Sequence, residues 1–192
     1  MPDVNQAALD FLLTRRSRPA KTLKGPGPDR AALMPILTAA ARSPDHGKLE
    51  PWRFIVLEGA AMARMAAETR KAGVRLNKSE EDIAKAEHAW ATSPLCVAVV
   101  EVQKASDKIP AIEMTYSAGA VCLAMLNAAL ASGWGANWLS GWASHDRAFL
   151  TEALGLAENE TLAGFIHIGT EGAAPPDRPR PDLDAITAWV SE

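Results

Sequence analysis

ARSPDHGKLEPWRF, residues 41–54, changes chemical character three times within 14 residues and sets the order of the elements around it. An apolar helical pattern runs up to Arg42, a polar loop follows, and a strand pattern begins with RFIVLE. Pro44 disfavours helical geometry at the residue before it, so the helix is expected to end there. Arg42, His46 and Lys48 then lie in a loop between two rigid elements, where binding groups are often found. An ordinary solvated loop explains the same composition.

The composition predicts one domain over residues 1–192, since 48% of the side chains are hydrophobic and can form a core. A formal net charge of -3 argues against a general binder of nucleic acid or acidic membranes. Cys96 and Cys122 form neither a C-x-x-C motif nor a metal-ligand spacing, so no metal site is predicted. Residues 1–14 lack a secretory signal pattern, which together with the two separated cysteines predicts a cytoplasmic protein.

Hydrophobic periodicity and capping residues predict helices and strands that intermix without a uniform strand–helix–strand rhythm. The expected helices cover residues 5–15, 29–42, 60–71, 79–90, 116–131 and 144–154, and the expected strands cover 54–57, 95–102, part of 133–141, and 161–168. Asp29, Ser79 and Ser144 are the expected N-caps of their helices. Pro35 should kink its helix or remove one backbone hydrogen bond. His167 alternates within the last strand and is interpreted as a hydrogen-bonded structural residue, and the proline-rich tail 171–192 is expected to be extended.

The stretch from Met114 to His145 contains no Asp, Glu, Lys or Arg. Its first part is helical in pattern and apolar on most faces, so it is either a membrane span or a helix buried on all sides. Ser117, Asn127 and many small residues favour the buried helix. A chain of this size does not easily cover such a helix by itself, which points to an obligate dimer.

Cationic groups occur at three separated places: Arg15–Ser17, Arg42 with His46, and Arg178 with Arg180. Arginine side chains and a serine hydroxyl suit a phosphate group. The chain has no P-loop and no G-x-G-x-x-G after a strand, which disfavours a nucleoside triphosphate or a Rossmann-bound dinucleotide. The segment GWGANWLSG, residues 133–141, is aromatic and small enough to let backbone approach a flat ring.

Four features in order, namely RRS at 15–17, SPDHGKLEPW at 43–52, the charge-poor helix with GWGANWLSG, and GFIHIGT at 164–170, make the chain resemble the FMN-dependent nitroreductase family over nearly its whole length. The resemblance implies an α+β fold with a mixed sheet wrapped by helices, and a homodimer joined along the long central helix. It also implies one FMN in each of two interface pockets. NADH or NADPH would reduce the flavin, and a nitroaromatic, quinone or similar acceptor would reoxidise it.

The resemblance also implies which residues bind the cofactors, and it implies no catalytic side chain, because FMN carries the chemistry. The implied FMN-binding residues are Arg15, Arg16, Ser17, Arg42, His46, Trp138, Leu139, Ser140, Gly141, Arg178 and Arg180, and the implied nicotinamide-binding residues are Ala129, Leu130, Ala131, Ser132, Gly133 and Trp134.

The chain departs from the family pattern at two places. Many relatives carry N-x-Q-P-W in the loop, where this chain has Lys48, Glu50, Pro51 and Trp52, and Leu139 stands where close relatives have arginine. The loss of that arginine predicts weaker flavin binding or a preference for less anionic acceptors. Two other hypotheses remain: a flavin storage or sensor protein of the same fold without turnover, and a basic arm in RRSRPAKTLK that binds nucleic acid.

Overall fold

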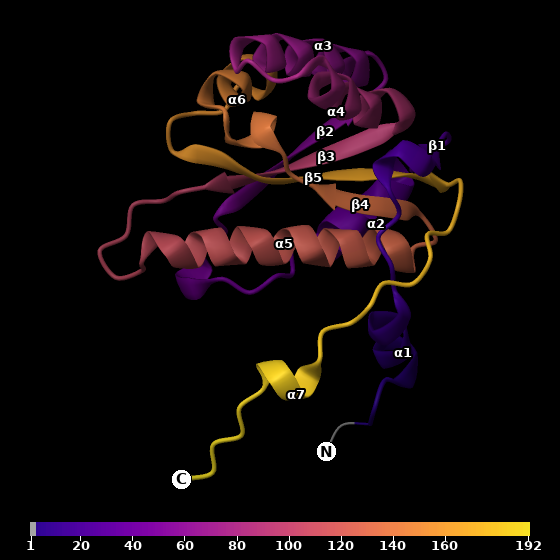
Figure 1. Cartoon of the computed structure of the whole chain (residues 1–192). Coiled ribbons are helices and arrows are strands. Elements are labelled where there is room, and N and C mark those ends of the chain that lie inside the picture. Colours follow the sequence, from indigo (N-terminus) through magenta and orange to yellow (C-terminus); the bar gives the residue numbers. More distant parts are fainter. Residues whose placement is uncertain (1–2) are drawn as a thin grey trace.

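The computed structural model describes residues 3–192 as a sheet with helices packed on both of its faces (Figure 1). Its elements are α1 (Gln6–Thr14), η1 (Ala20–Thr22), β1 (Leu23–Lys24), α2 (Arg30–Ala40), η2 (His46–Lys48), β2 (Trp52–Glu58), α3 (Ala60–Arg75), α4 (Glu80–Thr92), β3 (Leu95–Val102), α5 (Ala111–Ala131), β4 (Gly135–Leu139), η3 (Trp142–His145), α6 (Arg147–Leu154), β5 (Glu160–Glu171) and α7 (Leu183–Ile186). The expected helices and strands are therefore present, and β1, the short 3-10 helices and α7 are additions.

The strands form the order β1-β5-β3-β2, and β4 also pairs with β5. All four pairings are antiparallel, so the expectation of a mixed sheet is wrong. Two consecutive helices, α3 and α4, return the chain to the end of the sheet from which it left, and β3 therefore runs against β2. The α5 crossover does connect two strands of equal direction, β3 and β4, but β5 lies between them and pairs with both.

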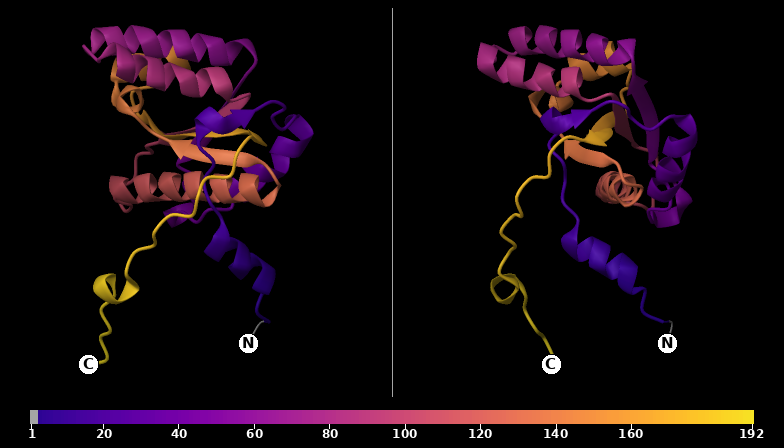
Figure 2. Two further views of the ribbon diagram at one scale, coloured as in Figure 1. Left: turned by 45° about the vertical axis from the view of Figure 1, so that its right-hand side comes forward. Right: turned by 90° about the vertical axis from the view of Figure 1, so that its right-hand side faces the viewer.

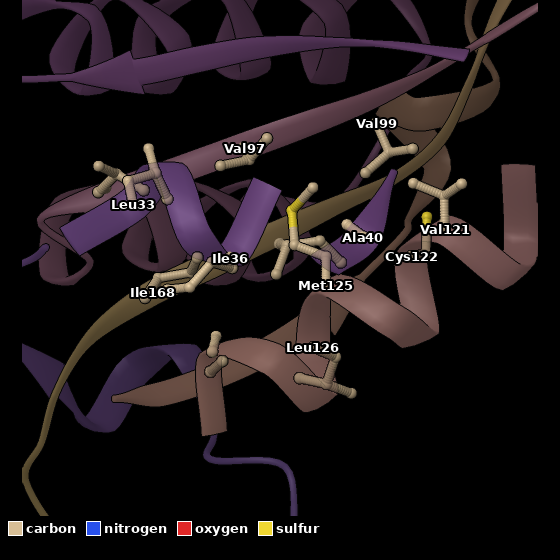
Figure 3. Packing of buried hydrophobic residues seen from close by; sticks show 14 residues of the cluster. Leu33, Ile36, Ala40, Val97, Val99, Val121, Cys122, Met125, Leu126 and Ile168 are labelled. Atoms are coloured by element: carbon tan, nitrogen blue, oxygen red, sulfur yellow. The ribbon is translucent and has the colours of Figure 1, made fainter. Parts of the chain in front are cut away.

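Strand β3 is the buried centre of this sheet, as its apolar sequence predicts. Val97 and Val99 point into a core formed with α2 and α5 (Figure 3), whereas Cys96, Ala98 and Val100 point into a second core formed with α3, α4 and α6. Each side chain from Cys96 to Val100 has 0% exposure. The two cores hold the sheet rigid between two helical layers.

Helix α5 has one buried face and one open face. The sheet-facing side includes Met114, Val121 and Met125, but Ile112, Tyr116 and Leu123 on the other side are 51%, 68% and 45% exposed. The helix is long and apolar enough to cross a membrane by length and composition, yet 44% of its most apolar 18-residue window is buried inside the molecule. A single chain therefore leaves an apolar stripe along α5 uncovered.

Local capping corrects one helix boundary and confirms two others. Asp29 and Ser79 accept hydrogen bonds from the first turns of α2 and α4. Ser144 lies in η3 and does not cap α6; the cap is Asp146, which accepts from the Phe149 amide at 2.8 Å. The interior Pro35 does not interrupt α2.

Helix α1 and the C-terminal tail leave the body of the molecule on the same side (Figure 2). No residue of α1 is buried, and the tail carries the exposed side chains Leu183, Ile186 and Trp189. The tail is extended apart from the single turn of α7, close to the expectation. Apolar arms without a partner in their own chain are a second sign of missing contacts.

Candidate functional site

The segment that follows α1 joins three distant parts of the sequence. The Arg18 amide donates to the Ala136 carbonyl of β4 at 2.8 Å, and the Arg16 guanidinium donates to the Pro176 carbonyl of the tail at 3.1 Å. These bonds place the tail beside the N-terminal segment. Arg180 lies close enough to Arg15 to affect its pKa.

Arg15 is the least satisfied cation of this group. Its Nη2 donates to Ser17 Oγ at 3.3 Å, but its Nε is buried without a hydrogen-bond partner. Burial lowers the pKa of Arg15, and the nearby positive charges of Arg180, Arg16 and Arg18 lower it further. Arg18 Nε is 2.7 Å from Glu171 Oε1 at the end of β5, an ion-pair distance without hydrogen-bond geometry. Arg180 pairs with Asp177 in the tail, so Arg15 and Arg16 are the two without a carboxylate partner in the described chain. We call Arg15, Arg16, Ser17 and Arg180 the cationic cluster, and its electrostatics favour an anion.

A cavity of about 370 Å³ lies at the other end of β4. Leu139, Ser140 and Gly141 form one wall, residues of α4 including Lys85 and Trp90 form another, and Phe165 and His167 of β5 also line it. The Arg18 amide bonds to Ala136, and Leu139 lies three residues further along β4. Three residues of a strand span about 10 Å. We call this space the ring cavity; its walls are apolar and aromatic, and its size suits a small planar molecule.

His167 is buried at 2% exposure in the wall of the ring cavity. Burial lowers its pKa to about 4, so the imidazole is neutral near pH 7. It packs against Trp90, whose Nε1 donates to Thr69 Oγ1 at 3.0 Å, and its own Nδ1 has no partner. The interpretation of His167 as a fully hydrogen-bonded structural residue is therefore wrong.

The loop after α2 lies at the opposite end of α5. His46 Nδ1 is 2.7 Å from Glu113 Oε2 in the first turn of α5, and Lys104 Nζ bonds to the Leu49 carbonyl. The 21 residues of α5 span about 30 Å. The segment that carries the cationic cluster bonds to β4, which begins just beyond the last turn of α5. His46 and Arg15 of one chain therefore lie at opposite ends of α5. Arg42, which follows α2, is exposed at the surface.

This loop carries backbone strain. Lys48 and Glu50 have φ of 55° and 48°, which is uncommon for residues other than glycine. The Glu50 amide donates to Asp45 Oδ2 at 3.0 Å, which helps hold the turn. Strained backbone of this kind is concentrated at binding sites.

The remaining predicted residues have simpler surroundings. Trp138 is the last residue but one of β4 and does not line the ring cavity, Arg178 is an exposed tail residue, and Arg180 also bonds to Asp177 within the tail. Residues 129–134 form the C-terminal end of α5, where Gly133 has φ 83° and the Trp134 amide donates to the Ala129 carbonyl at 3.1 Å. Lys85 and Trp90 were missed by sequence analysis, because nothing in the pattern of α4 separates a cavity-lining side from a core-facing side.

Comparisons with known proteins agree with this architecture. The family profile described as "Nitroreductase family" matches residues 12–170. The inferred NAD(P)H nitroreductase YdjA of Escherichia coli (strain K12) is 36% identical over 163 residues, which cover 85% of this chain and 87% of YdjA.

Solved structures show the same fold. A nitroreductase-like family protein from Bacillus cereus has a TM-score of 0.81 at 21% identity, with 99% of this chain and 98% of that chain covered. A nitroreductase-type protein from Desulfovibrio desulfuricans, solved in complex with FMN, has a TM-score of 0.76 at 21% identity, with 99% of each chain covered.

Proposed function

The chain belongs to the nitroreductase family of oxidoreductases, and we propose that it binds FMN and uses NADH or NADPH to reduce nitroaromatics, quinones or similar acceptors. The observation that carries the proposal is the buried, unpartnered Arg15 Nε among three other arginines. The structural relative from Desulfovibrio desulfuricans holds FMN, and YdjA is named for NAD(P)H.

The cationic cluster fits the phosphate of FMN. A phosphate would supply an acceptor to Arg15 Nε and offset the repulsion that lowers the Arg15 pKa. Arg16 is oriented by the Pro176 carbonyl, and the Ser17 hydroxyl lies beside Arg15, so both are available to the same anion. Arg178 and Arg180 would add positive charge from the tail.

The ring cavity fits the isoalloxazine ring. It begins about 10 Å along β4 from the anchoring point of the cationic cluster, a separation that the ribityl chain would bridge. The backbone of Leu139, Ser140 and Gly141 would face the ring, whereas Trp138, the residue before Leu139 in β4, does not line this cavity. Bound FMN would supply the hydride-transfer chemistry. This chain would orient the ring and keep water from it with apolar walls.

Leu139 gives the ring cavity an apolar wall at a position where the resemblance to the family implies an arginine. Because no guanidinium is present at this position, the site should favour acceptors without an anionic substituent. His167 stays neutral above its pKa of about 4 and so does not replace the missing charge. We place the nicotinamide donor near residues 129–134, on the resemblance to the family.

A homodimer would complete the site. The uncovered stripe of α5 and the exposed apolar side chains of α1 and the tail are surfaces that a second copy would cover. If two α5 helices pack in opposite directions, the loop at the start of one helix lies near the end of the other. Arg42 and His46 of the second copy would then approach the cationic cluster, which one chain alone does not achieve.

Spectroscopy of the purified protein tests the proposal. Protein made with ample riboflavin should be yellow, and anaerobic addition of NADH or NADPH should bleach it. A yellow protein that is not bleached by either nucleotide would instead be a storage or sensor protein. A colourless monomer would contradict the proposal. The basic-arm hypothesis is disfavoured by the contacts of Arg16 and Arg18 with the chain's own tail and β5, and salt-dependent DNA binding would revive it.

The dimer has a separate test. Tyr116→Glu places a charge in the open stripe of α5 and should give a monomer that binds FMN poorly. Val74→Glu alters an equally exposed residue, 64% against 68%, on α3 and should leave both properties unchanged. Light scattering after size exclusion measures the mass, and a dimeric, yellow Tyr116→Glu variant would exclude this interface.

A further inference from the structure

A second and larger cavity, of about 550 Å³, is lined by residues of the sheet, of α5 and of α6. Its lining includes Glu101 of β3, Thr115 of α5, Trp138 of β4, and Leu150 of α6. Trp138 pairs with Ile166, which belongs to the core under α5, whereas Leu139 of the ring cavity pairs with Phe165 of the opposite core. Trp138 and Leu139 therefore lie on different faces of β4, and Ser144 is the one lining residue that the two cavities share. We call the larger one the Glu101 cavity.

Glu101 is a carboxylate buried at 7% exposure. Thr115 Oγ1 donates to its Oε1 at 2.7 Å, Thr161 Oγ1 donates to its Oε2 at 3.0 Å, and the Gln103 amide also bonds to Oε1. Each of these neighbours donates to a carboxylate oxygen. A carboxylate has about four acceptor positions, so one stays free.

The Glu101 carboxylate has hydrogen-bond donors but no ion-pair partner in the described part of the chain. Among residues 3–192, none of the ion pairs includes Glu101. Arg147 lines the same cavity, and its guanidinium donates hydrogen bonds to the Glu160 and Leu156 carbonyls and to Thr151 Oγ1. It donates none to Glu101. Burying a carboxylate without a counter-charge is costly, and a cationic ligand would remove much of that cost.

The aromatic wall of the cavity suits the same ligand. The indole of Trp138 lies over Gly164, where an added Cβ would come within 2.0 Å of Nε1, so glycine is required for this position of the ring. An indole is the aromatic group that attracts a cation most strongly. Leu150 and Leu162 add apolar surface that would contact the rest of a small molecule.

We propose that the Glu101 cavity binds an organic ammonium ion, that is, a protonated amine on a small apolar body. Its N–H groups would donate to Glu101, and its charge would lie near the Trp138 ring. This site goes beyond the proposed flavin chemistry and does not depend on it. The competing outcome is an anion site, because His145 and Arg147 also line the cavity.

Three probes with one ring and different charges test the proposal by calorimetric titration of the purified dimer or monomer as it is isolated. Benzylamine should bind, whereas benzyl alcohol and benzoate should bind at least about 10-fold more weakly, as expected for the loss of a charge-assisted hydrogen bond. Equal affinities, tighter binding of benzoate, or no binding of benzylamine would each overturn the proposal. This ranking needs no variant and no flavin.

Variants then locate the site. Glu101→Gln should weaken benzylamine binding by about 10- to 100-fold, while Glu101→Asp, which keeps the charge, should weaken it less. Glu158→Gln removes one exposed carboxylate and is the matched control, with unchanged affinity expected. Unchanged binding in a folded Glu101→Gln variant would overturn the assignment. Size exclusion of each variant detects any change of subunit contact.

Discussion

Two groups of arginines in this molecule differ in whether they pair with carboxylates. Arg53 forms a two-pronged pair with Glu160, with Nε–Oε1 at 2.6 Å and Nη2–Oε2 at 2.8 Å, and Arg70 contacts both Glu80 and Glu87. Arg15, by contrast, has a buried Nε without a partner and other arginines nearby. The paired arginines are complete within the folded chain. The unpaired one is complete only with an anion from outside, which is why we assign it to binding and the others to stability.

The largest expected effect is on cofactor binding by Arg15→Ala. Loss of a charge-assisted contact to phosphate should weaken the FMN affinity by about 10- to 100-fold, and the apoprotein should melt no lower, because repulsion within the cationic cluster is relieved. Flavin fluorescence quenching measures the affinity. Arg30→Ala, which removes an exposed arginine from α2, is the control and should bind FMN normally. An unchanged FMN affinity in Arg15→Ala would contradict the assignment of Arg15 to cofactor binding.

Arg53→Met should show the reverse behaviour, with lower stability and normal FMN affinity. Glu160 is only 11% exposed at its side chain and would be left without its main counter-charge. We expect a loss of about 2 kcal/mol in the free energy of unfolding, reduced from the value for a fully buried pair because Arg53 is 39% exposed. Urea denaturation measures it, and a fully stable variant would show that the pair contributes little.

The contribution of the Arg53–Glu160 pair to stability should decrease in acid. The hydrogen bond from Arg53 lowers the pKa of Glu160 to about 2, from a model-peptide value of 4.5. Because the folded-state pKa is the lower one, the stabilisation is complete above about pH 4.5 and is lost as the pH falls towards 2. We expect about 1–2 kcal/mol of this loss in the parent chain and much less in Arg53→Met. Identical acid dependence in both proteins would contradict the assignment.

Arg70→Ala should have the smallest effect. Its two carboxylate partners lie at the surface between α3 and α4, where solvent screens the interaction. FMN affinity should be unchanged and the melting temperature only slightly lower. A large loss of stability would mean that this exposed network matters as much as the Arg53–Glu160 pair.

Local signals allowed much of the fold to be predicted from sequence. The apolar run LCVAVVEV predicted the central strand, Asp29 and Ser79 predicted helix starts, and Pro44 predicted the end of α2. Each depends on a preference of one residue or a short run. Strand direction does not, and the expected mixed sheet was wrong because β5 inserts between β3 and β4.

The candidate site was predicted in composition but not in arrangement. The arginines of the cationic cluster stood out because no acid lies among them in sequence, and the tail was expected to join them, as the Arg16 contact with Pro176 supports. His46 was expected in the same place, and the single chain puts it at the far end of α5. The ring-cavity residues Lys85 and Trp90, and the buried Glu101, carried no sequence signal that distinguished them from ordinary helix and strand residues.

By itself, the sequence determined the identity of the elements and the excess of positive charge near residue 16, because periodicity, capping and charge are properties of neighbouring residues. Only the tertiary structure decided which charges are neutralised. The carboxylate that pairs with Arg53 is 107 residues away, and the tail carbonyl that orients Arg16 is 160 residues away. Whether a buried charge has a partner depends on distances in space, and those are set by how the sheet is ordered and where the chain ends return.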